Sequence, residues 1–382
     1  MTRRRALAIA AVWVVGFGLL RVSLLAPEAC PFPSSSEAMS AAMAAGDWIA
    51  TGQGPDGRYL YEYDRDAGQE RPGYNIVRHA GVTMSLYQLA AAGQDKILEV
   101  ADRGLDSMLD GLEPAGDGLA LVEPGASTAR LGATALLTAA LLDRRVATGD
   151  ERYDDELRSL GRFMVGQIGP TGRTVAVYDL DVDAPTDETS RYATGEAGWA
   201  LARLHTTFPD EGWDEPARVI AQYLATARDD AEGLDYQPWP DQWAAYLLSE
   251  LAPEGLSAEQ AAYARRLAAR FGMLIRVESQ KDGWPTPFVD AHARAAGLGV
   301  WVEGLGSLVR VATADTRLAD LRPELEDRLA CGASLLVERQ VDDGPHEEAG
   351  AWFREDVTRM DDQQHALSGL LAAARLAGGD GR

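Results

Sequence analysis

The chain has 382 residues, of which 46% are hydrophobic and 25% are charged. This composition is ordinary for a globular protein and argues against extensive disorder. The formal net charge is −23 at pH 7, so the protein as a whole repels nucleic-acid phosphates and anionic lipid headgroups. The charge argues against a nucleic-acid partner, and a strongly anionic polymer would need a local basic pocket in order to bind.

The N-terminus has the pattern of an export signal. Three arginines, Arg3 to Arg5, precede an uncharged and mostly apolar run from Ala6 to Leu20. A helix of this run spans about 22 Å, short of the roughly 30 Å hydrocarbon core of a bilayer, and the sites for signal cleavage are poor. We expect residues 1–26 to form a signal-anchor that holds an extracytoplasmic body at the membrane. The alternative is a signal peptide that is cleaved, followed by secretion.

Two cysteines are present, Cys30 in an expected linker over residues 27–36 and Cys331 in the body. They cannot form a CxxC-type metal cluster, and they neither prove nor exclude an oxidising compartment. No spacing of histidines and carboxylates resembles a metal motif either. We therefore expect no metal and no other cofactor.

Internal repetition is the strongest signal in the sequence. A glycine-centred turn recurs six times, usually beside an acidic or polar residue, at separations of 61, 54, 61, 50 and 61 residues. A glutamine lies three to five residues before four of the turns: Gln53, Gln167, Gln280 and Gln340. The turn glycines are Gly57, Gly118, Gly172, Gly233, Gly283 and Gly344.

Helical segments alternate across these turns. The segments before the turns are amphipathic with a charged face, which is typical of outer helices: 37–51, 97–112, 153–168, 215–228, 258–277 and 318–339. The segments after the turns are rich in Ala, Gly and Leu, which is typical of closely packed inner helices: 77–92, 128–142, 194–205, 241–251, 291–312 and 361–376. Six hairpins without polar capping repeats predict one all-α domain over residues 37–378, an (α/α)6 toroid with short extended segments between outer and inner helices. The alternative is an open solenoid.

In such a ring the N-terminal ends of the inner helices meet at one mouth, together with their positive dipole ends. Polar residues at the helix starts are therefore candidate site residues. At the first start, Arg78 could bind carboxylate or hydroxyl groups and His79 could transfer protons, or both could be structural. Nearby candidates for substrate binding are Tyr74, Asn75 and, at the second start, Arg130.

Three further starts carry carboxylates. Glu196 follows Tyr192 and could serve as a general acid or could balance an arginine. Asp241 could act in catalysis or could cap its helix, beside Gln242 and the sugar-stacking candidate Trp243. Asp362 shares a helix face with His365. At the fifth start, Trp284 and His292 are substrate-binding candidates. Three of the five histidines, His79, His292 and His365, are expected at this mouth.

The six inner helices and the repeated Gln…Asp-Gly turns resemble the six-hairpin (α/α)6 carbohydrate-active enzymes. This group includes unsaturated glucuronyl hydrolases and other glycosidases, and related toroids include N-acylglucosamine 2-epimerases. Arg78 on the first inner helix and His365 on the last resemble the epimerase arrangement, whereas Asp241 stands where that arrangement has a histidine. The resemblance covers residues 37–378 and concerns architecture and turn pattern.

We therefore expect an exported enzyme that acts on a carbohydrate, a glycoside hydrolase in which two of Glu196, Asp241 and Asp362 serve as acid and base. The alternatives are a sugar epimerase that uses His79 or His365, and a glycan-binding toroid without catalysis. The fold alone does not decide among these functions.

Overall fold

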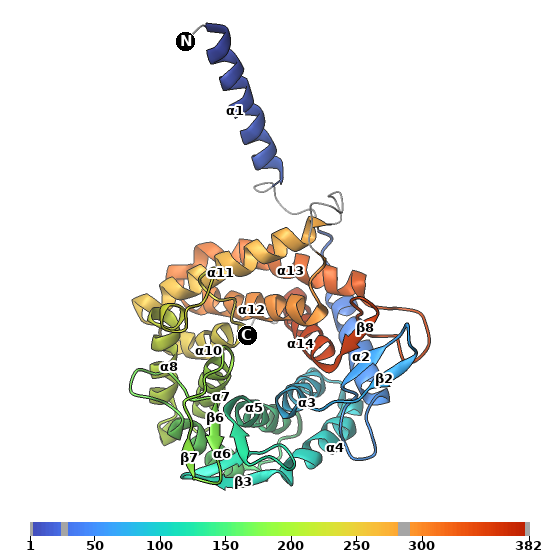
Figure 1. Ribbon diagram of the computed structural model, residues 1–382, viewed down its shortest axis with the longest axis vertical. Helices are drawn as coiled ribbons and strands as arrows, with labels where there is room; N and C mark the ends of the chain where they lie inside the picture. Colours follow the sequence, from blue (N-terminus) through green and yellow to red (C-terminus); the bar gives the residue numbers. More distant parts are fainter. Residues whose placement is uncertain (1–2, 24–29, 282–290, 379–382) are drawn as a thin grey trace.

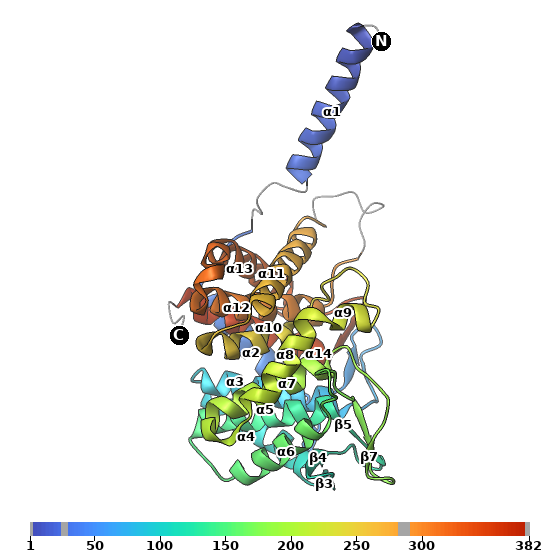
Figure 2. The ribbon, with the colours of Figure 1, turned by 90° about the vertical axis from the view of Figure 1, so that its left-hand side faces the viewer.

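The computed structural model describes residues 3–23, 30–281 and 291–378. The body is a ring of two concentric helix layers, with one further helix, α1 (Arg3–Ser23), standing apart from it (Figures 1 and 2). The outer helices are α2 (Ser35–Thr51), α4 (Leu98–Leu109), α6 (Asp154–Gly166), α8 (Asp214–Thr226), α11 (Ala258–Ser279) and α13 (Arg322–Arg339). The inner helices are α3 (Ile76–Ala91), α5 (Leu131–Thr148), α7 (Ala193–Thr207), α10 (Gln242–Leu251), α12 (Ala295–Ala314) and α14 (Met360–Ala377).

The ring closes, as the sequence predicted. Each inner helix packs on the next, and the last, α14, packs on the first, α3. A three-stranded antiparallel sheet also joins the two ends of the ring, because β8 (Val357–Arg359) pairs with β1 (Glu62–Asp64), which pairs with β2 (Gln69–Arg71). The fold is therefore an (α/α)6 toroid, and the open solenoid is excluded.

Other short strands lie between outer and inner helices. The strands β3 (Leu112–Ala115) and β4 (Gly118–Leu121) form a hairpin, and β5 (Thr128–Arg130), β6 (Val177–Asp179) and β7 (Ala184–Pro185) form a second three-stranded sheet. A short helix, α9 (Arg228–Ala231), follows α8, and within the described residues short 3-10 helices lie at Asp95–Ile97, Pro209–Glu211, Ala252–Glu254 and Thr316–Leu321.

Three of the predicted turn glycines, Gly57, Gly118 and Gly172, pack on the next outer helix in the ring, whereas Gly233 has no such contact and Gly283 lies outside the described residues. A Cβ on Gly57, whose φ is +81°, would lie 2.3 Å from the Arg103 carbonyl oxygen of α4, and a Cβ on Gly118 would lie 2.2 Å from the Ser159 oxygen of α6. Only glycine allows this approach. In the last turn the close position is Gly350, 2.3 Å from the Ala44 oxygen of α2, so the assignment to Gly344 was wrong by six residues.

The turn glutamines have a matching role. The Gln53 amide donates to the Gly57 oxygen of its own turn and to the Val100 oxygen of α4, at 3.1 and 2.9 Å. The Gln340 amide donates to the Gly350 oxygen and to the Ala41 oxygen of α2, both at 2.9 Å. These two side chains join their turns to the following hairpin, which gives glutamine a structural role at both positions.

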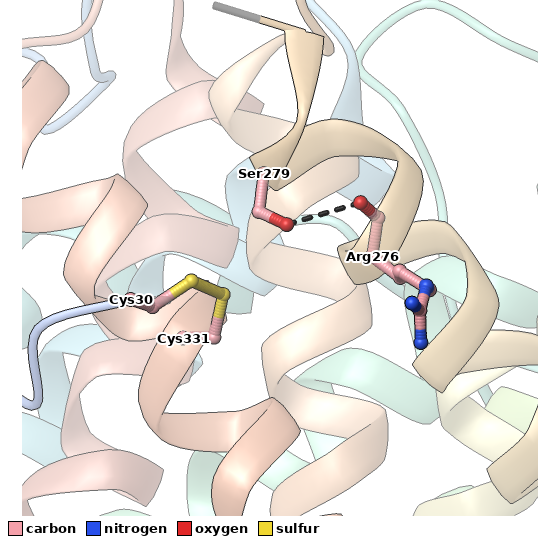
Figure 3. Close-up of a disulfide and its surroundings, with 4 residues drawn as sticks. All are labelled: Cys30, Arg276, Ser279 and Cys331. Carbon is pink, nitrogen blue, oxygen red and sulfur yellow. Dashed lines mark hydrogen bonds between the residues drawn. A yellow bond between two sulfur atoms is a disulfide. The ribbon is translucent and has the colours of Figure 1, made fainter. Parts of the chain in front are cut away.

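Among the described residues, α12 is the helix whose length and hydropathy would suffice to cross a membrane, and 67% of that stretch is buried inside the protein. It is a core helix of the ring. Cys30 and Cys331, whose pairing the sequence alone does not predict, form a disulfide with a Cα–Cα distance of 5.0 Å. The bridge attaches the segment before α2 to α13, beside the end of α11 where Ser279 Oγ donates to the Arg276 carbonyl oxygen (Figure 3).

Candidate active site

The starts of neighbouring inner helices lie against one another, as expected for parallel inner helices. Arg78 near the start of α3 lies 3.5 Å from Asp361 near the start of α14. At the other side of the ring, a Cβ on Gly195 of α7 would lie 3.0 Å from Asp241 Oδ2 at the N-cap of α10. The ring thus gathers candidate residues from several helices at one end.

Glu196 is 5% exposed, near the start of α7. Its Oε2 would lie 2.3 Å from a Cβ on Gly132 of α5, so the absence of a side chain at that position leaves room for the carboxyl group. Burial raises the pKa of Glu196 to about 8, the negative charge of Asp241 adds to this, and His365 partly opposes it. A carboxyl group whose pKa is raised in this way keeps its proton to a higher pH than an ordinary carboxyl group, as a general acid requires.

His365 of α14 pairs with Glu303 of α12. The imidazole Nδ1 lies 2.9 Å from Glu303 Oε1, and Glu303 is fully buried. Burial lowers the pKa of His365, but the carboxylates of Glu303, Asp361 and Glu196 outweigh it, so the net pKa is raised. The charges of His365 and Glu196 also influence each other. The site therefore has a carboxyl group on α7 and an imidazole on α14.

An aromatic stack lies beside this pair. The rings of Trp199 on α7 and of Trp243 and Tyr246 on α10 have centroids 4.7 to 5.7 Å apart and are nearly parallel. The His365 ring is 6.1 Å from Trp243. Aromatic faces of this kind suit the C–H faces of a sugar ring.

Arg78 is partly exposed and lies between an aromatic and an acidic side chain. Its Nη1 donates to the Tyr61 hydroxyl at 2.7 Å, and its Nη2 lies 3.5 Å from Asp361 Oδ2. Asp361 also lies 3.3 Å from the guanidinium of Arg359. Asp361 thus forms ion pairs with two arginines at the start of α14, four residues before His365.

Two of the carboxylates expected in catalysis are bound in structural contacts. Asp241 and Arg228 form an ion pair in which both side chains are fully buried, and the other oxygen of Asp241 accepts from the Trp243 and Ala244 amides. The Arg228 guanidinium also donates to the Tyr263 hydroxyl at 2.9 Å. These contacts favour the capping interpretation of Asp241.

Asp362 is held in a similar way. It is almost fully buried and lies 2.6 Å from Arg294 Nη2, and it accepts from the backbone amides of Ala296 and Arg359. Both of its oxygens are used to connect the starts of α12 and α14. This arrangement leaves Asp362 without a free oxygen for acid–base chemistry.

Two of the three histidines expected at the mouth lie elsewhere. His79 is fully buried between α3 and α4, where Nε2 lies 2.9 Å from the Gly104 oxygen and 3.2 Å from Ser107 Oγ. Burial lowers its pKa to about 4, against the effect of the Gly104 contact. His292 contacts Glu278 of α11 and Arg339 of α13, on the outer layer. The expectation of a three-histidine mouth was wrong because a residue next to a helix start can face the outer layer.

The remaining candidates lie around the helix starts. Asn75 caps α3 by accepting from the Arg78 amide at 3.1 Å, and Tyr74 packs between Arg58 and His79. Arg130 is exposed at the N-cap of α5, Tyr192 is 46% exposed at that of α7, and Gln242 is buried. Trp284 lies outside the described residues.

Sequence reasoning missed Glu303, Asp361 and the aromatic partners Trp199 and Tyr246. Glu303 had a usable signal, since it is the single carboxylate in a mostly apolar inner helix, the same feature that identified Glu196. Within the described ranges, no group of three or more His, Cys, Asp or Glu side chains could hold a metal ion.

No family model and no curated protein matches the sequence. Solved structures do match its fold. Cellobiose 2-epimerase from Spirochaeta thermophila superposes with a TM-score of 0.66 at 15% identity, over 91% of this chain and 97% of that one. An unsaturated glucuronyl hydrolase specific for heparin gives 0.60 at 12% identity, over 89% and 98%. The GH76A alpha-1,6-mannanase from Salegentibacter sp. gives 0.59 at 13%, over 89% and 99%. The chain thus shares the six-hairpin toroid fold of these carbohydrate enzymes.

Proposed function

We propose that the protein is a carbohydrate-active enzyme, a glycoside hydrolase in which Glu196 is the general acid. The observation that carries this proposal is the burial of Glu196, which raises its pKa to about 8, on the same helix as Trp199 of the aromatic stack. A protonated carboxyl group can donate to the leaving oxygen of a glycosidic bond. Asp361, which lies within ion-pair distance of Arg78 and Arg359, replaces Asp241 and Asp362 as the candidate base or nucleophile.

A second candidate reaction is sugar epimerisation. It is favoured by the His365–Glu303 pair opposite Glu196, because an imidazole and a carboxyl group on facing helices can remove and return a proton at one carbon. The two reactions would share the aromatic stack and Arg78. They differ in whether a glycosidic bond breaks.

We also propose that the body is exported and held at the membrane by its N-terminal segment. Arg3 to Arg5 form the first turn of helix α1, whose large apolar side chains are exposed, among them Val12, Trp13 and Phe17. The Cys30–Cys331 disulfide adds support, since structural disulfides persist in oxidising compartments outside the cytoplasm. Fractionation and cysteine labelling of whole cells test this; full-length protein in the cytosolic fraction would contradict it.

The enzymatic proposal is tested with a panel of neutral and uronic-acid-containing glycans, with mass spectrometry of the products. Hydrolysis in heavy-oxygen water places the heavy oxygen in the new sugar end, whereas epimerisation in deuterium oxide exchanges one carbon-bound hydrogen without cleavage. Glu196→Gln should reduce either rate by about 10²–10⁴-fold. Binding of a glycan without either isotope change would show a binding protein, and an active Glu196→Gln variant would end the acid assignment.

A further inference from the structure

The aromatic stack of the candidate active site offers little free surface to a ligand. The rings of Trp199, Trp243 and Tyr246 stack on one another, and the three residues are 2%, 3% and 9% exposed. In the described residues from α2 onward, the exposed Phe, Trp and Tyr side chains are Tyr192, at 46%, and Tyr236, at 82%. Tyr192 lies at the N-cap of the inner helix α7, where a ligand that enters the mouth of the ring can reach it.

Tyr192 lies one helical turn before Glu196. The Glu196 amide donates to the Tyr192 carbonyl oxygen at 3.0 Å, and residues four apart share a helix face. Partial burial raises the pKa of the Tyr192 hydroxyl, the charge of Asp241 adds to this, Arg191 opposes it, and Glu196 adds further. The exposed ring is therefore close to the carboxyl group that is the candidate general acid.

Trp239 holds Tyr192 in place from a neighbouring segment. The two ring centroids are 6.4 Å apart at an interplanar angle of 58°. The Arg191 guanidinium lies over the Trp239 ring, 4.9 Å from its centroid. Trp239 precedes the N-cap of α10, where the Asp241 amide donates to the Trp239 oxygen at 2.8 Å. Two consecutive residues at the start of α7 are thus packed on one tryptophan from the segment before α10, the next inner helix in the ring (Figure 1).

Arg191 has hydrogen-bond donors to offer to a ligand. It is exposed, and within the described part of the chain it forms no ion pair, so that its contact is the face of Trp239. A guanidinium has five N–H donors in a planar fork. Asp187 and Glu188, shortly before it in the chain, are also exposed. These carboxylates disfavour an anionic ligand, whereas the hydroxyl groups of an uncharged sugar need donors without a net positive charge.

We propose that Tyr192, Arg191 and Trp239 form a subsite for a neutral sugar ring next to Glu196, which we call the rim subsite. The C–H face of the sugar packs on the Tyr192 ring, and its hydroxyl groups accept from the Arg191 guanidinium. Trp239 is a positioning residue that holds both side chains. The inference rests on the proposed carbohydrate-active function and assigns a neutral sugar to this position of the substrate.

Calorimetric titration of the full chain carrying Glu196→Gln measures affinity without turnover. The ligands are cellotriose, maltotriose and xylotriose, and we expect at least one of them to bind. Adding Tyr192→Ala should weaken that binding about ten-fold, since a truncated aromatic contact typically costs this much. Tyr192→Phe keeps the ring and should keep the affinity. Tyr236→Ala removes the other exposed tyrosine, which lies by Arg270, and is the matched control that should leave the affinity unchanged.

The positioning role of Trp239 is tested by a double-variant cycle. Trp239→Leu should weaken binding of the same trisaccharide, and combining it with Tyr192→Ala should add little further loss, because both changes remove the same contact. In the protein with Glu196 intact, Tyr192→Ala should raise KM about ten-fold while kcat stays nearly constant, as expected for binding that is equal in the ground and transition states. Melting temperatures of all variants confirm that each one is folded.

An unchanged affinity in Tyr192→Ala, or an equal loss in Tyr236→Ala, would overturn the rim subsite. Failure of all three trisaccharides to bind would overturn it as well. If the wild type converts a glycan and its KM is unchanged in Tyr192→Ala, the rim subsite is rejected while the proposed function stands. If a trisaccharide binds in a way that depends on Tyr192 but no glycan is hydrolysed or epimerised, the proposed enzymatic function fails and the subsite stands.

Discussion

His365 and Glu303 connect the last two inner helices, with the imidazole Nδ1 2.9 Å from the Glu303 Oε1 atom. The pair is enclosed by the helices of the ring, since Glu303 is fully buried and the side chain of His365 is 15% exposed. An ionised carboxylate at this distance favours the imidazolium form. The contact therefore sets the proton affinity of the one histidine that faces the aromatic stack.

Glu303→Gln should lower the pKa of His365. Burial lowers this pKa and the charge of Glu303 raises it, so removal of the charge leaves the effect of burial less opposed. In the native protein the raised pKa means that the imidazolium stabilises the fold below the unfolded-state pKa of about 6.5, and this contribution is lost as pH rises through the higher folded pKa. Titration of the His365 ring proton by NMR measures the change. Glu324→Gln, at an exposed carboxylate of α13, is the control; an unaltered His365 titration in Glu303→Gln would contradict the assignment.

Glu196 should make the free energy of unfolding decrease as pH rises, whereas a carboxyl group with a lowered pKa makes it increase. Its folded pKa, about 8, lies above the ordinary value of 4.5. Between these values the folded state binds more protons than the unfolded state, so the free energy of unfolding falls as pH rises. Glu196→Gln keeps the shape of the side chain but does not titrate.

Denaturant unfolding of the wild type and of Glu196→Gln at several pH values in this window tests the point. The variant should lose less stability between mildly acidic and mildly alkaline pH than the wild type. Parallel curves for the two proteins would show that Glu196 is ionised throughout, and the general-acid role would then fail. Glu324→Gln serves again as the matched carboxylate change at an exposed site.

The fold was predictable from the sequence because it rests on local signals that repeat. The outer and inner segments have different hydrophobic patterns, and the turn glycines are required wherever a turn approaches the next outer helix, as at Gly57 and Gly118. The last turn was misplaced because Gly344 and Gly350 both lie in a turn-like sequence, and only the contact with Ala44 distinguishes them.

The site was predictable only in part because side-chain direction is not a local property. His79 and Arg78 are adjacent, yet the first faces the outer helix α4 and the second faces Asp361. The arginine partners of Asp241 and Asp362 also come from distant segments, since Arg228 precedes α10 and Arg294 precedes α12. The sequence does not identify these arginines as the partners of the two carboxylates. The packing of the helices brings each pair together.

The disulfide should stabilise the protein by closing a loop of 301 residues between Cys30 and Cys331. Long loops lose much chain entropy on closure, and removal of a native disulfide typically costs about 2–5 kcal/mol. We expect the melting temperature to fall on reduction and the Cys30→Ser/Cys331→Ser double variant to be insensitive to reductant. Alkylation of the unreduced, denatured wild type at both cysteines would show that the bridge does not form.

The buried pair of Arg228 and Asp241 gives the clearest separation between structural and catalytic roles. Both side chains are fully buried and bonded to each other. Asp241→Asn leaves the arginine as an unpaired buried charge, and Arg228→Met does the same to the carboxylate, so each single variant should lose about 3–5 kcal/mol. The double variant should recover part of this loss because no unpaired charge remains.

Asp320→Asn, which breaks the exposed Arg265–Asp320 pair, is the control and should cost about 0–1 kcal/mol. Unfolding curves for the four variants and the wild type give the coupling free energy of the buried pair. If Asp241→Asn instead retains the stability of the wild type while turnover of a glycan disappears, Asp241 belongs with Glu196 in the catalytic group, and its place as a helix cap is incidental.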